Sequence, residues 1–212
     1  MASDQTVHLS GLHSSDAEPL SRIHMLAFPD FFLSRLGHTF LKEFYRGFLG
    51  ADDVVAVVAR DSQGRPVGAA VGPLEPEGFF GRLLRRRLMG FVRASTIAAV
   101  RQPRAIPRLV RAVTYRGVSS ARTSGALLSS ICVEPGRRGT GLGSLLLIEW
   151  EEEARARGAT VAHLTTDADS NHAVNDFYAH HGWQCVDQFA TREGRIMNTY
   201  VKSLRPTNGA PS

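Results

Sequence analysis

The sequence has few cysteines and no long apolar run. Cys132 and Cys185 are the two cysteines among 212 residues. Both lie in apolar, strand-like segments, so we expect small buried residues in a reducing cytosol rather than a disulfide framework. No apolar stretch approaches the roughly 18 residues of a membrane-spanning helix, and residues 1–18 lack the apolar core of a signal peptide. A cytoplasmic location is therefore expected.

Acidic residues are missing from one long segment. Residues 79–125 carry 11 arginines and no Asp or Glu, whereas the rest of the chain carries 14 basic and 20 acidic residues, which gives the net charge of +5. Apolar residues recur here at helical spacing, with the arginines largely on another face. Gln102 and Pro103 divide the segment into two predicted helices.

The arginines of this segment allow three interpretations. They can form a solvated face, they can bind an anion such as phosphate through bidentate hydrogen bonds, or they can contact RNA or an anionic membrane surface. After Phe91, Tyr115 is the one aromatic residue among them. Base stacking therefore has little support, which argues against nucleic acid as a partner.

The remaining segments alternate between strand-like and helix-like patterns. Strands are predicted over 7–12, 54–59, 66–72, 126–133, 160–166, 184–190 and 196–202, and helices over 15–28, 31–49, 142–157 and 171–181. This order predicts an α/β (α+β) fold, with a mixed, mostly antiparallel sheet of about seven strands flanked by helices. We expect one domain over 1–205, a helical Arg-rich insert over 75–125 between the third and fourth strands, and a disordered tail over 206–212.

A glycine-rich turn joins the predicted strand 126–133 to the helix that follows. Residues 133–144 read Val-Glu-Pro-Gly-Arg-Arg-Gly-Thr-Gly-Leu-Gly-Ser. Backbone N–H groups at a helix start are unpaired and carry the positive end of the helix dipole, and glycines let a ligand approach them, so this turn suits a pyrophosphate. The lysine of a P-loop and the Gly-x-Gly-x-x-Gly spacing of a dinucleotide site are both absent.

Two motifs resemble those of the GCN5-related N-acetyltransferases (GNAT). Arg138-Gly-Thr-Gly141-Leu-Gly143 is similar to the coenzyme A loop Arg/Gln-x-x-Gly-x-Gly/Ala of that family. Residues 171–183 resemble its Asn-x-x-Ala-x-x-x-Tyr-x-x-x-Gly-Phe helix, with Val174 for Ala and Trp183 for Phe. The resemblance implies an acyltransferase (EC 2.3.1 class) that moves an acetyl group from acetyl-CoA, its co-substrate, to a primary amine by direct attack in a ternary complex.

The same resemblance implies roles for individual residues. The strands 126–133 and 160–166 would splay apart, and the pantetheine arm would pair with Ile131, Cys132 and Val133, the Ile131 N–H facing the thioester carbonyl. Asn171 would bind the arm, unless it only caps its helix. Tyr178 would be the general acid near the sulfur, unless it is a core tyrosine. The pyrophosphate would contact Arg137, Arg138, Gly139, Thr140, Gly141, Leu142, Gly143 and Ser144.

The general base is left open. Leu127 stands roughly where some family members carry a glutamate. The candidates that remain are Glu134, His163, Asp167 and, through water, Ser129 or Ser130. Asp167 is the leading choice because it ends a predicted strand beside the acceptor gap, with a water chain as an equal alternative and His163 expected in the core. His172, His180 and His181 lack carboxylate or cysteine partners at metal-binding spacing, so no metal is predicted.

The acceptor is expected at the link between the first two helices, where Asp30 could pair with an ammonium group beside Phe31 and Phe32. Residues 33–41 and the helical insert loosely resemble a subgroup of sugar-modification enzymes. This favours a small-molecule amine, namely an amino sugar or nucleotide-linked amino sugar whose phosphates would meet the arginines. Alternatives are a protein or peptide N-acetyltransferase and a non-catalytic acyl-CoA-binding module. Acyl-chain length and oligomeric state, with a homodimer as one option, stay open.

Overall fold

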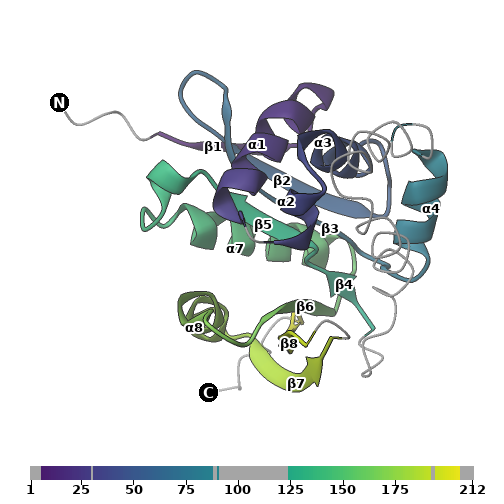
Figure 1. Ribbon diagram of the computed structural model, residues 1–212, viewed down its shortest axis with the longest axis vertical. Coiled ribbons are helices and arrows are strands. Elements are labelled where there is room, and N and C mark those ends of the chain that lie inside the picture. Colours follow the sequence, from purple (N-terminus) through teal and green to yellow (C-terminus); the bar gives the residue numbers. More distant parts are fainter. Residues whose placement is uncertain (1–5, 30, 88–89, 91–123, 192–193, 206–212) are drawn as a thin grey trace, which may run out of the picture.

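The computed structural model describes residues 6–29, 31–87, 90, 124–191 and 194–205. These residues form a mixed α/β structure with two four-stranded sheets, ordered β1-β2-β3-β5 and β4-β6-β8-β7 (Figure 1). The strands are β1 His8–Gly11, β2 Val54–Arg60, β3 Pro66–Pro73, β4 Ala126–Leu127, β5 Ser130–Val133, β6 Val161–Asp167, β7 Gln184–Ala190 and β8 Ile196–Ser203. The helices are η1 Ser14–Asp16, α1 Ala17–Ala27, α2 Phe32–Arg35, α3 His38–Arg46, α4 Phe79–Arg86, η3 Pro135–Arg137, α7 Leu142–Ala156 and α8 His172–His180. The predicted fold class is confirmed.

The first sheet is buried on both faces. Strands β2 and β3 are runs of Val, Ala and Gly, the pattern of a strand covered from both sides. Residues such as Val58 and Val71 pack in one apolar cluster with α1, α3 and α4. Their neighbours Val57 and Ala70 pack in a second cluster with α7. The sheet therefore separates two apolar cores, one on each of its faces.

The predicted helix over 31–49 is interrupted at Gly37. Its φ of 88° lies in the left-handed region, which glycine adopts without steric cost. The chain therefore forms a short helix, α2, and then a separate helix, α3. The prediction of one continuous helix was wrong because apolar residues at helical spacing do not reveal the turn at Gly37.

The predicted strand over 126–133 is divided into two strands that belong to different sheets. Strand β4 pairs in parallel with β6, and the Leu128 N–H donates to the His163 carbonyl at 3.0 Å. Strand β5 instead pairs antiparallel with β3. Gly72 permits the change of partner, since a Cβ there would lie 1.8 Å from the Leu127 carbonyl oxygen. The two sheets thus diverge at residues 128–129.

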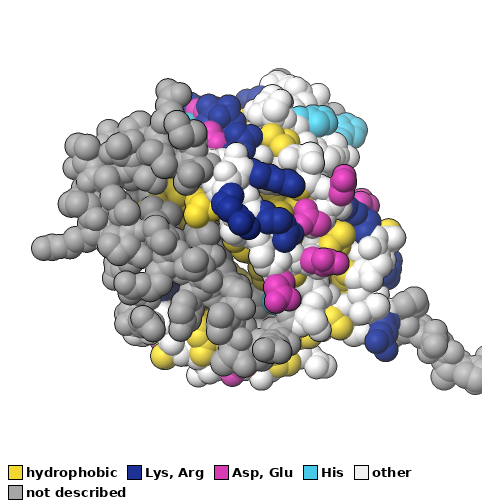
Figure 2. All heavy atoms as spheres, turned by 90° about the vertical axis from the view of Figure 1, so that its right-hand side faces the viewer, with side chains coloured by type: hydrophobic (Ala, Val, Ile, Leu, Met, Phe, Trp, Pro, Cys, Tyr) yellow, Lys and Arg dark blue, Asp and Glu magenta, His cyan; other side chains and the backbone are white. Residues whose placement is uncertain are grey.

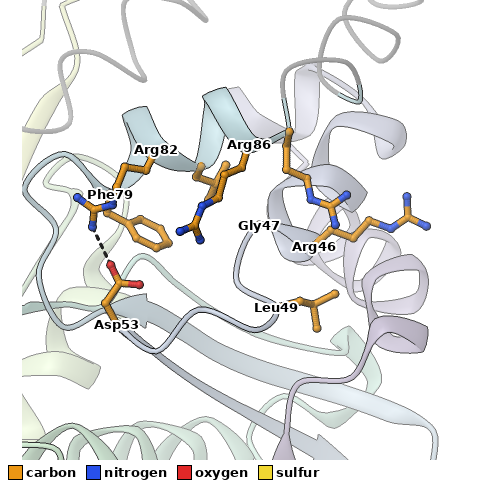
Figure 3. A pocket seen from close by; sticks show the side chains of 9 residues that line it. Arg46, Gly47, Leu49, Asp53, Phe79, Arg82 and Arg86 are labelled. Atoms are coloured by element: carbon orange, nitrogen blue, oxygen red, sulfur yellow. Dashed lines mark hydrogen bonds and ion pairs between the residues drawn. The ribbon is translucent and has the colours of Figure 1, made fainter.

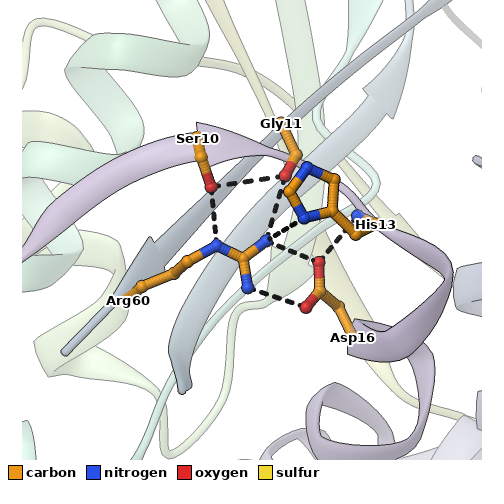
Figure 4. Close-up of polar contacts among 5 residues, drawn as sticks. All are labelled: Ser10, Gly11, His13, Asp16 and Arg60. Carbon is orange, nitrogen blue, oxygen red and sulfur yellow. Dashed lines mark hydrogen bonds and ion pairs between the residues drawn. The ribbon is translucent and has the colours of Figure 1, made fainter. Parts of the chain in front are cut away.

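A partly buried arginine, Arg60, holds residues 10–16 on the first sheet (Figure 4). The Arg60 guanidinium donates to both carboxylate oxygens of Asp16, each at 2.8 Å, and to the Ser10 hydroxyl at 2.7 Å. The His13 N–H donates to Asp16 at 2.7 Å. The hydrogen-bonded Asp16 carboxylate raises the pKa of Arg60. This network ties β1 and η1 to β2.

Trp183, which stands where the family motif has Phe, has a specific partner. Its indole N–H donates to Glu151 Oε1 of α7 at 2.8 Å, and Lys202 Nζ lies 2.6 Å from Glu151 Oε2. A buried indole N–H needs such an acceptor. The substitution therefore links α7 to β7 and β8 through one buried carboxylate.

The two cysteines differ in exposure. Cys132 is buried, as expected, but Cys185 is exposed, which corrects the prediction that both are buried. Strand β7 lies at the edge of its sheet and is largely exposed, and no sequence pattern within the strand reports that position.

In the insert, α4 matches the start of the first predicted helix. The second predicted helix and the tail over 206–212 lie outside the described residues.

Candidate active site

Strand β5 carries an open backbone edge. The Glu134 N–H donates to the Val67 carbonyl at 2.9 Å. Because N–H groups alternate in direction along an antiparallel strand, that of Cys132 points toward β3, and those of Ile131 and Val133 point away from it. No described strand pairs with this second edge of β5. An extended chain with amide groups could therefore add there as a strand.

Strand β6 presents a matching edge across the divergence. Its even-numbered residues bond to β8, because the Leu204 N–H donates to the Thr160 carbonyl and the Ala168 N–H to the Ile196 carbonyl. The backbone groups of Thr165 and Asp167 consequently face the β5 side. The side-chain amides of Asn171 and Asn175 both donate to the Asp167 carbonyl at 3.0 Å. The start of α8 is thereby fixed to the end of β6.

The loop after β5 ends at the start of a long helix. Gly139 and Gly141 adopt φ of 77° and 84°, which side-chain-bearing residues rarely adopt, and α7 begins at Leu142. The first N–H groups of α7 have no partner within the helix. The 15-residue helix also directs its positive dipole end toward this loop. The loop therefore has the geometry of an anion site.

The two arginines of the loop have different contacts. An Arg138 Nη donates to the Ala27 carbonyl at 2.7 Å and so connects the loop to the end of α1. Arg137 forms an ion pair with Glu134 at 3.6 Å. The Thr140 hydroxyl donates to the Arg137 carbonyl at 2.8 Å. Both arginines belong to the loop. Arg138 also connects the loop to α1, the helix that precedes the predicted acceptor residues.

Tyr178 lies on α8 with its ring packed against Trp183 and Tyr200, at centroid distances of 5.9 and 5.8 Å. It is 6% exposed, and burial raises its pKa, so its hydroxyl stays protonated. Phe177, the preceding residue, lies 3.7 Å from a Cβ built at Gly143, so α8 runs beside the start of α7.

Asp167 is held by an arginine from the β7–β8 turn. Arg195 donates to Oδ1 at 2.9 Å and to Oδ2 at 2.5 Å. The same guanidinium lies over the Phe31 ring, 5.7 Å from its centroid. The structure therefore brings together Phe31 and Asp167, two predicted site residues, and adds Arg195 between them. Phe32 begins α2, and Asp30 lies outside the described residues.

The other candidate bases differ in environment. Burial lowers the pKa of His163 to about 4, so it is neutral at pH 7 and a weak proton acceptor. Glu134 is exposed and paired with Arg137. Cys132 is no thiolate nucleophile, because burial raises its pKa to about 11. Asp167 has both oxygens occupied by Arg195, so a proton from a substrate would have to compete with that bidentate pair.

A buried polar network lies behind β5. His24 Nδ1 is 3.0 Å from the Tyr45 hydroxyl and 3.4 Å from the Ser130 hydroxyl. Tyr45 in turn is 3.3 Å from Cys132 Sγ. Sequence reasoning named Ser130 but missed His24 and Tyr45. The only signal for them is that each is a polar residue on the apolar face of its helix.

Comparison with known proteins identifies the class. The acetyltransferase (GNAT) family model matches residues 18–183, so the chain belongs to this family. It is therefore an acyltransferase, and acetyl-CoA is its co-substrate. No curated protein matches the chain by sequence.

Solved structures share the fold at low sequence identity. The ribosomal-protein-S18-alanine N-acetyltransferase from Escherichia coli has a TM-score of 0.54 and 15% identity, with 98% of this chain and 99% of that chain covered. An aminoglycoside 6'-N-acetyltransferase complexed with coenzyme A has a TM-score of 0.60 and 16% identity, over 97% and 99%. NAA60 from Arabidopsis thaliana in complex with acetyl-CoA has a TM-score of 0.57 and 16% identity, over 93% and 98%. These likenesses establish the fold and leave the acceptor open.

The described residues contain no group of three or more His, Cys, Asp or Glu side chains placed to hold a metal ion. They also contain no helix with the length and apolar character to cross a membrane.

Proposed function

We propose that the protein transfers the acetyl group of acetyl-CoA to a primary amine of a small molecule, with amino sugars and nucleotide-linked amino sugars as the candidate class. The observation that carries the cofactor half of this proposal is the open edge of β5 beside a helix-capped anion loop. One extended ligand with amides at one end and a pyrophosphate at the other would use both features.

In this proposal the backbone holds the cofactor. The pantetheine amides pair with Ile131 and Val133, and the pyrophosphate lies on the N–H groups of residues 139–144, with Cys132 between the pairing residues and Arg137 and Arg138 alongside. The Ile131 N–H also donates to the thioester carbonyl as charge develops on its oxygen. Asn171 Nδ2 donates to Thr166 Oγ1 at 2.9 Å and to the Asp167 carbonyl, which leaves its Oδ1 to accept from the pantetheine arm.

Tyr178 would stabilise the leaving thiolate. Its raised pKa keeps the proton on the phenol, so the hydroxyl can donate a hydrogen bond to the sulfur as negative charge builds up. The same raised pKa makes complete proton transfer to the thiolate unfavourable, because a thiol is a stronger acid than this phenol. A hydrogen bond that strengthens along the reaction is the role that burial of this hydroxyl supports.

The amine must lose a proton to attack the thioester. We propose that Ser130, which is partly exposed on β5, accepts this proton while its own hydroxyl proton passes to His24 Nδ1. Asp167 and Arg195 would instead position the acceptor together with Phe31. In this arrangement Ser130 and His24 take the role of the glutamate that some family members carry roughly where this chain has Leu127.

The acceptor class rests on charge. The described part of the acceptor side offers Phe31 and the Arg195–Asp167 pair, and α4, at the start of the basic insert, carries Arg82, Arg85 and Arg86. Arginines repel a lysine-rich or otherwise cationic peptide and attract an anionic small molecule. This favours a phosphorylated or nucleotide-linked amine over a basic protein segment.

The proposal is tested by thiol release from acetyl-CoA with a panel of amines: amino sugars, nucleotide-linked amino sugars, aminoglycosides, polyamines and peptides. Turnover on an amino sugar class supports it. Turnover on peptides alone would instead support the alternative of a protein or peptide N-acetyltransferase. Tight acetyl-CoA binding without turnover on any amine would favour the non-catalytic alternative.

A further inference from the structure

Helix α4 and the end of α3 enclose a hollow lined by arginines, which the acetyl-transfer chemistry does not use. It has a volume of about 90 Å³ and lies at the start of the basic insert. The face of the molecule that carries α4 shows basic side chains gathered beside acidic ones (Figure 2). The lining residues are Arg46, Gly47, Leu49, Asp53, Phe79, Arg82, Leu83, Arg86 and Arg87.

The sequence forms this hollow by turning one helix face inward. Phe79, Phe80 and Leu83 of α4 are buried, and the arginines therefore lie on the remaining faces. Gly47 lets α4 approach α3 closely, because a Cβ there would lie 2.5 Å from Leu83. The side chains of Arg82 and Arg86 point from α4 toward the segment that carries Asp53 (Figure 3).

Carboxylates hold three of the four arginines in place. Arg82 pairs with Asp53 at 2.7 Å, and the buried Glu43 pairs with Arg46 at 2.7 Å and with Arg87 at 3.1 Å. No described carboxylate pairs with Arg86. Four guanidinium groups are thus opposed by two carboxylates, and the hollow keeps an excess positive charge. Ion pairs hold Arg46, Arg82 and Arg87, and the fourth arginine, Arg86, is exposed.

The hollow is separate from the coenzyme loop. That loop follows Val133, which pairs with Gly68 near the start of β3, whereas α4 follows the end of β3 at Pro73. At about 3.3 Å per residue, this stretch of β3 alone spans roughly 16 Å. The pyrophosphate on the loop therefore cannot also occupy the hollow.

We propose that the hollow binds a phosphate group, with Arg86 and Arg82 as its principal donors. Guanidinium groups bind phosphate oxygens in pairs, and the volume suits one small anionic group. The phosphate can belong to the acceptor, in which case the inference rests on the proposed function, or it can be a free anion.

A chain of aromatic contacts connects the hollow with the network behind β5. The Phe79 ring lies 5.5 Å from Phe48, Phe48 lies 5.0 Å from Phe44, and Phe44 lies 6.4 Å from His24.

Binding of inorganic pyrophosphate and of UDP tests the site directly, by calorimetry on the full chain saturated with coenzyme A so that the loop is occupied. We expect Arg86→Ala to weaken pyrophosphate binding by about tenfold, the loss of one charged hydrogen-bonded contact. Arg85→Ala is the matched control, because Arg85 lies on the same helix, is exposed and does not line the hollow. It should leave the affinity unchanged.

No pyrophosphate binding by the coenzyme-saturated wild type, or equal loss in Arg85→Ala and Arg86→Ala, overturns the proposal. Since this readout needs no turnover, it is independent of the proposed acetyl transfer. The source of the phosphate follows from kinetics in Arg86→Ala. A raised KM for a UDP-linked amino sugar but not for the free amino sugar supports an acceptor phosphate, and unchanged KM values with lost pyrophosphate binding support a free anion.

Discussion

The proposed cofactor side and the proposed acceptor side of this site are built in different ways. The proposed cofactor side consists of backbone groups: the open edge of β5, two glycines with positive φ and the start of α7, all within residues 130–144. The proposed acceptor side consists of side chains from distant segments, such as Phe31, Asp167 and Arg195. In this proposal the backbone binds the ligand that the family shares, and side chains, which substitution changes directly, bind the ligand that varies.

The largest expected effect concerns the reaction centre, where both sides meet. Tyr178→Phe removes the hydroxyl that stabilises the thiolate, and kcat should fall about a hundredfold, with acetyl-CoA affinity unchanged. The raised pKa of Tyr178 also predicts no alkaline loss of wild-type rate up to about pH 9 from this group. Steady-state kinetics over pH checks both points, and an unchanged kcat would make Tyr178 a core residue.

The next prediction concerns the contribution of His163 to the pH dependence of folding stability. Burial lowers its pKa to about 4, from an ordinary value of about 6.5. The unfolded chain therefore binds more protons between these values, and stability falls as the pH drops through this window. Lowering the pH from 7 to 5 should cost about 2 kcal/mol through this residue. Urea titration of wild type and His163→Gln should show a smaller pH dependence in the variant; parallel curves would refute this assignment.

On the cofactor side, Gly141→Ala should raise the KM for acetyl-CoA about tenfold, because a left-handed conformation costs a residue with a Cβ about 1–2 kcal/mol. Gly136→Ala is the matched control, since Gly136 lies in the same loop, has no positive φ, and an added Cβ would meet nothing within 4 Å. The KM for the amine should stay constant in both variants. Equal effects of the two substitutions would contradict the assigned role of the loop conformation.

The smallest predicted effect distinguishes two residues on the acceptor side. Ser130→Ala should lower kcat about fivefold at pH 7, the loss of one neutral hydrogen bond, and less at pH 9, where more of the amine is already neutral. Asp167→Asn should raise the KM for the amine and change kcat little. If Asp167→Asn instead lowers kcat with the same pH dependence, Asp167 is the base.

The contrast also explains what the sequence could reveal. The glycine loop and the Tyr178 helix are contiguous motifs, so residues 138–144 and 171–183 identify the family without a structure. The break between β4 and β5 depends on Gly72, a residue of another strand, and the exposure of Cys185 depends on strand order. His24 and Ser130 are 106 residues apart and meet only through packing. Contacts of this kind leave no pattern along the chain.

The open edge of β5 is the central claim, and amide hydrogen exchange measured residue by residue with and without acetyl-CoA tests it most directly. The account predicts that acetyl-CoA slows exchange at Ile131 and Val133, whose N–H groups face the open edge. Exchange at Cys132, whose N–H group already faces β3, should change little. Protection of residues 139–144 without any change at Ile131 and Val133 would contradict the claim, because the pantetheine arm would then lie elsewhere.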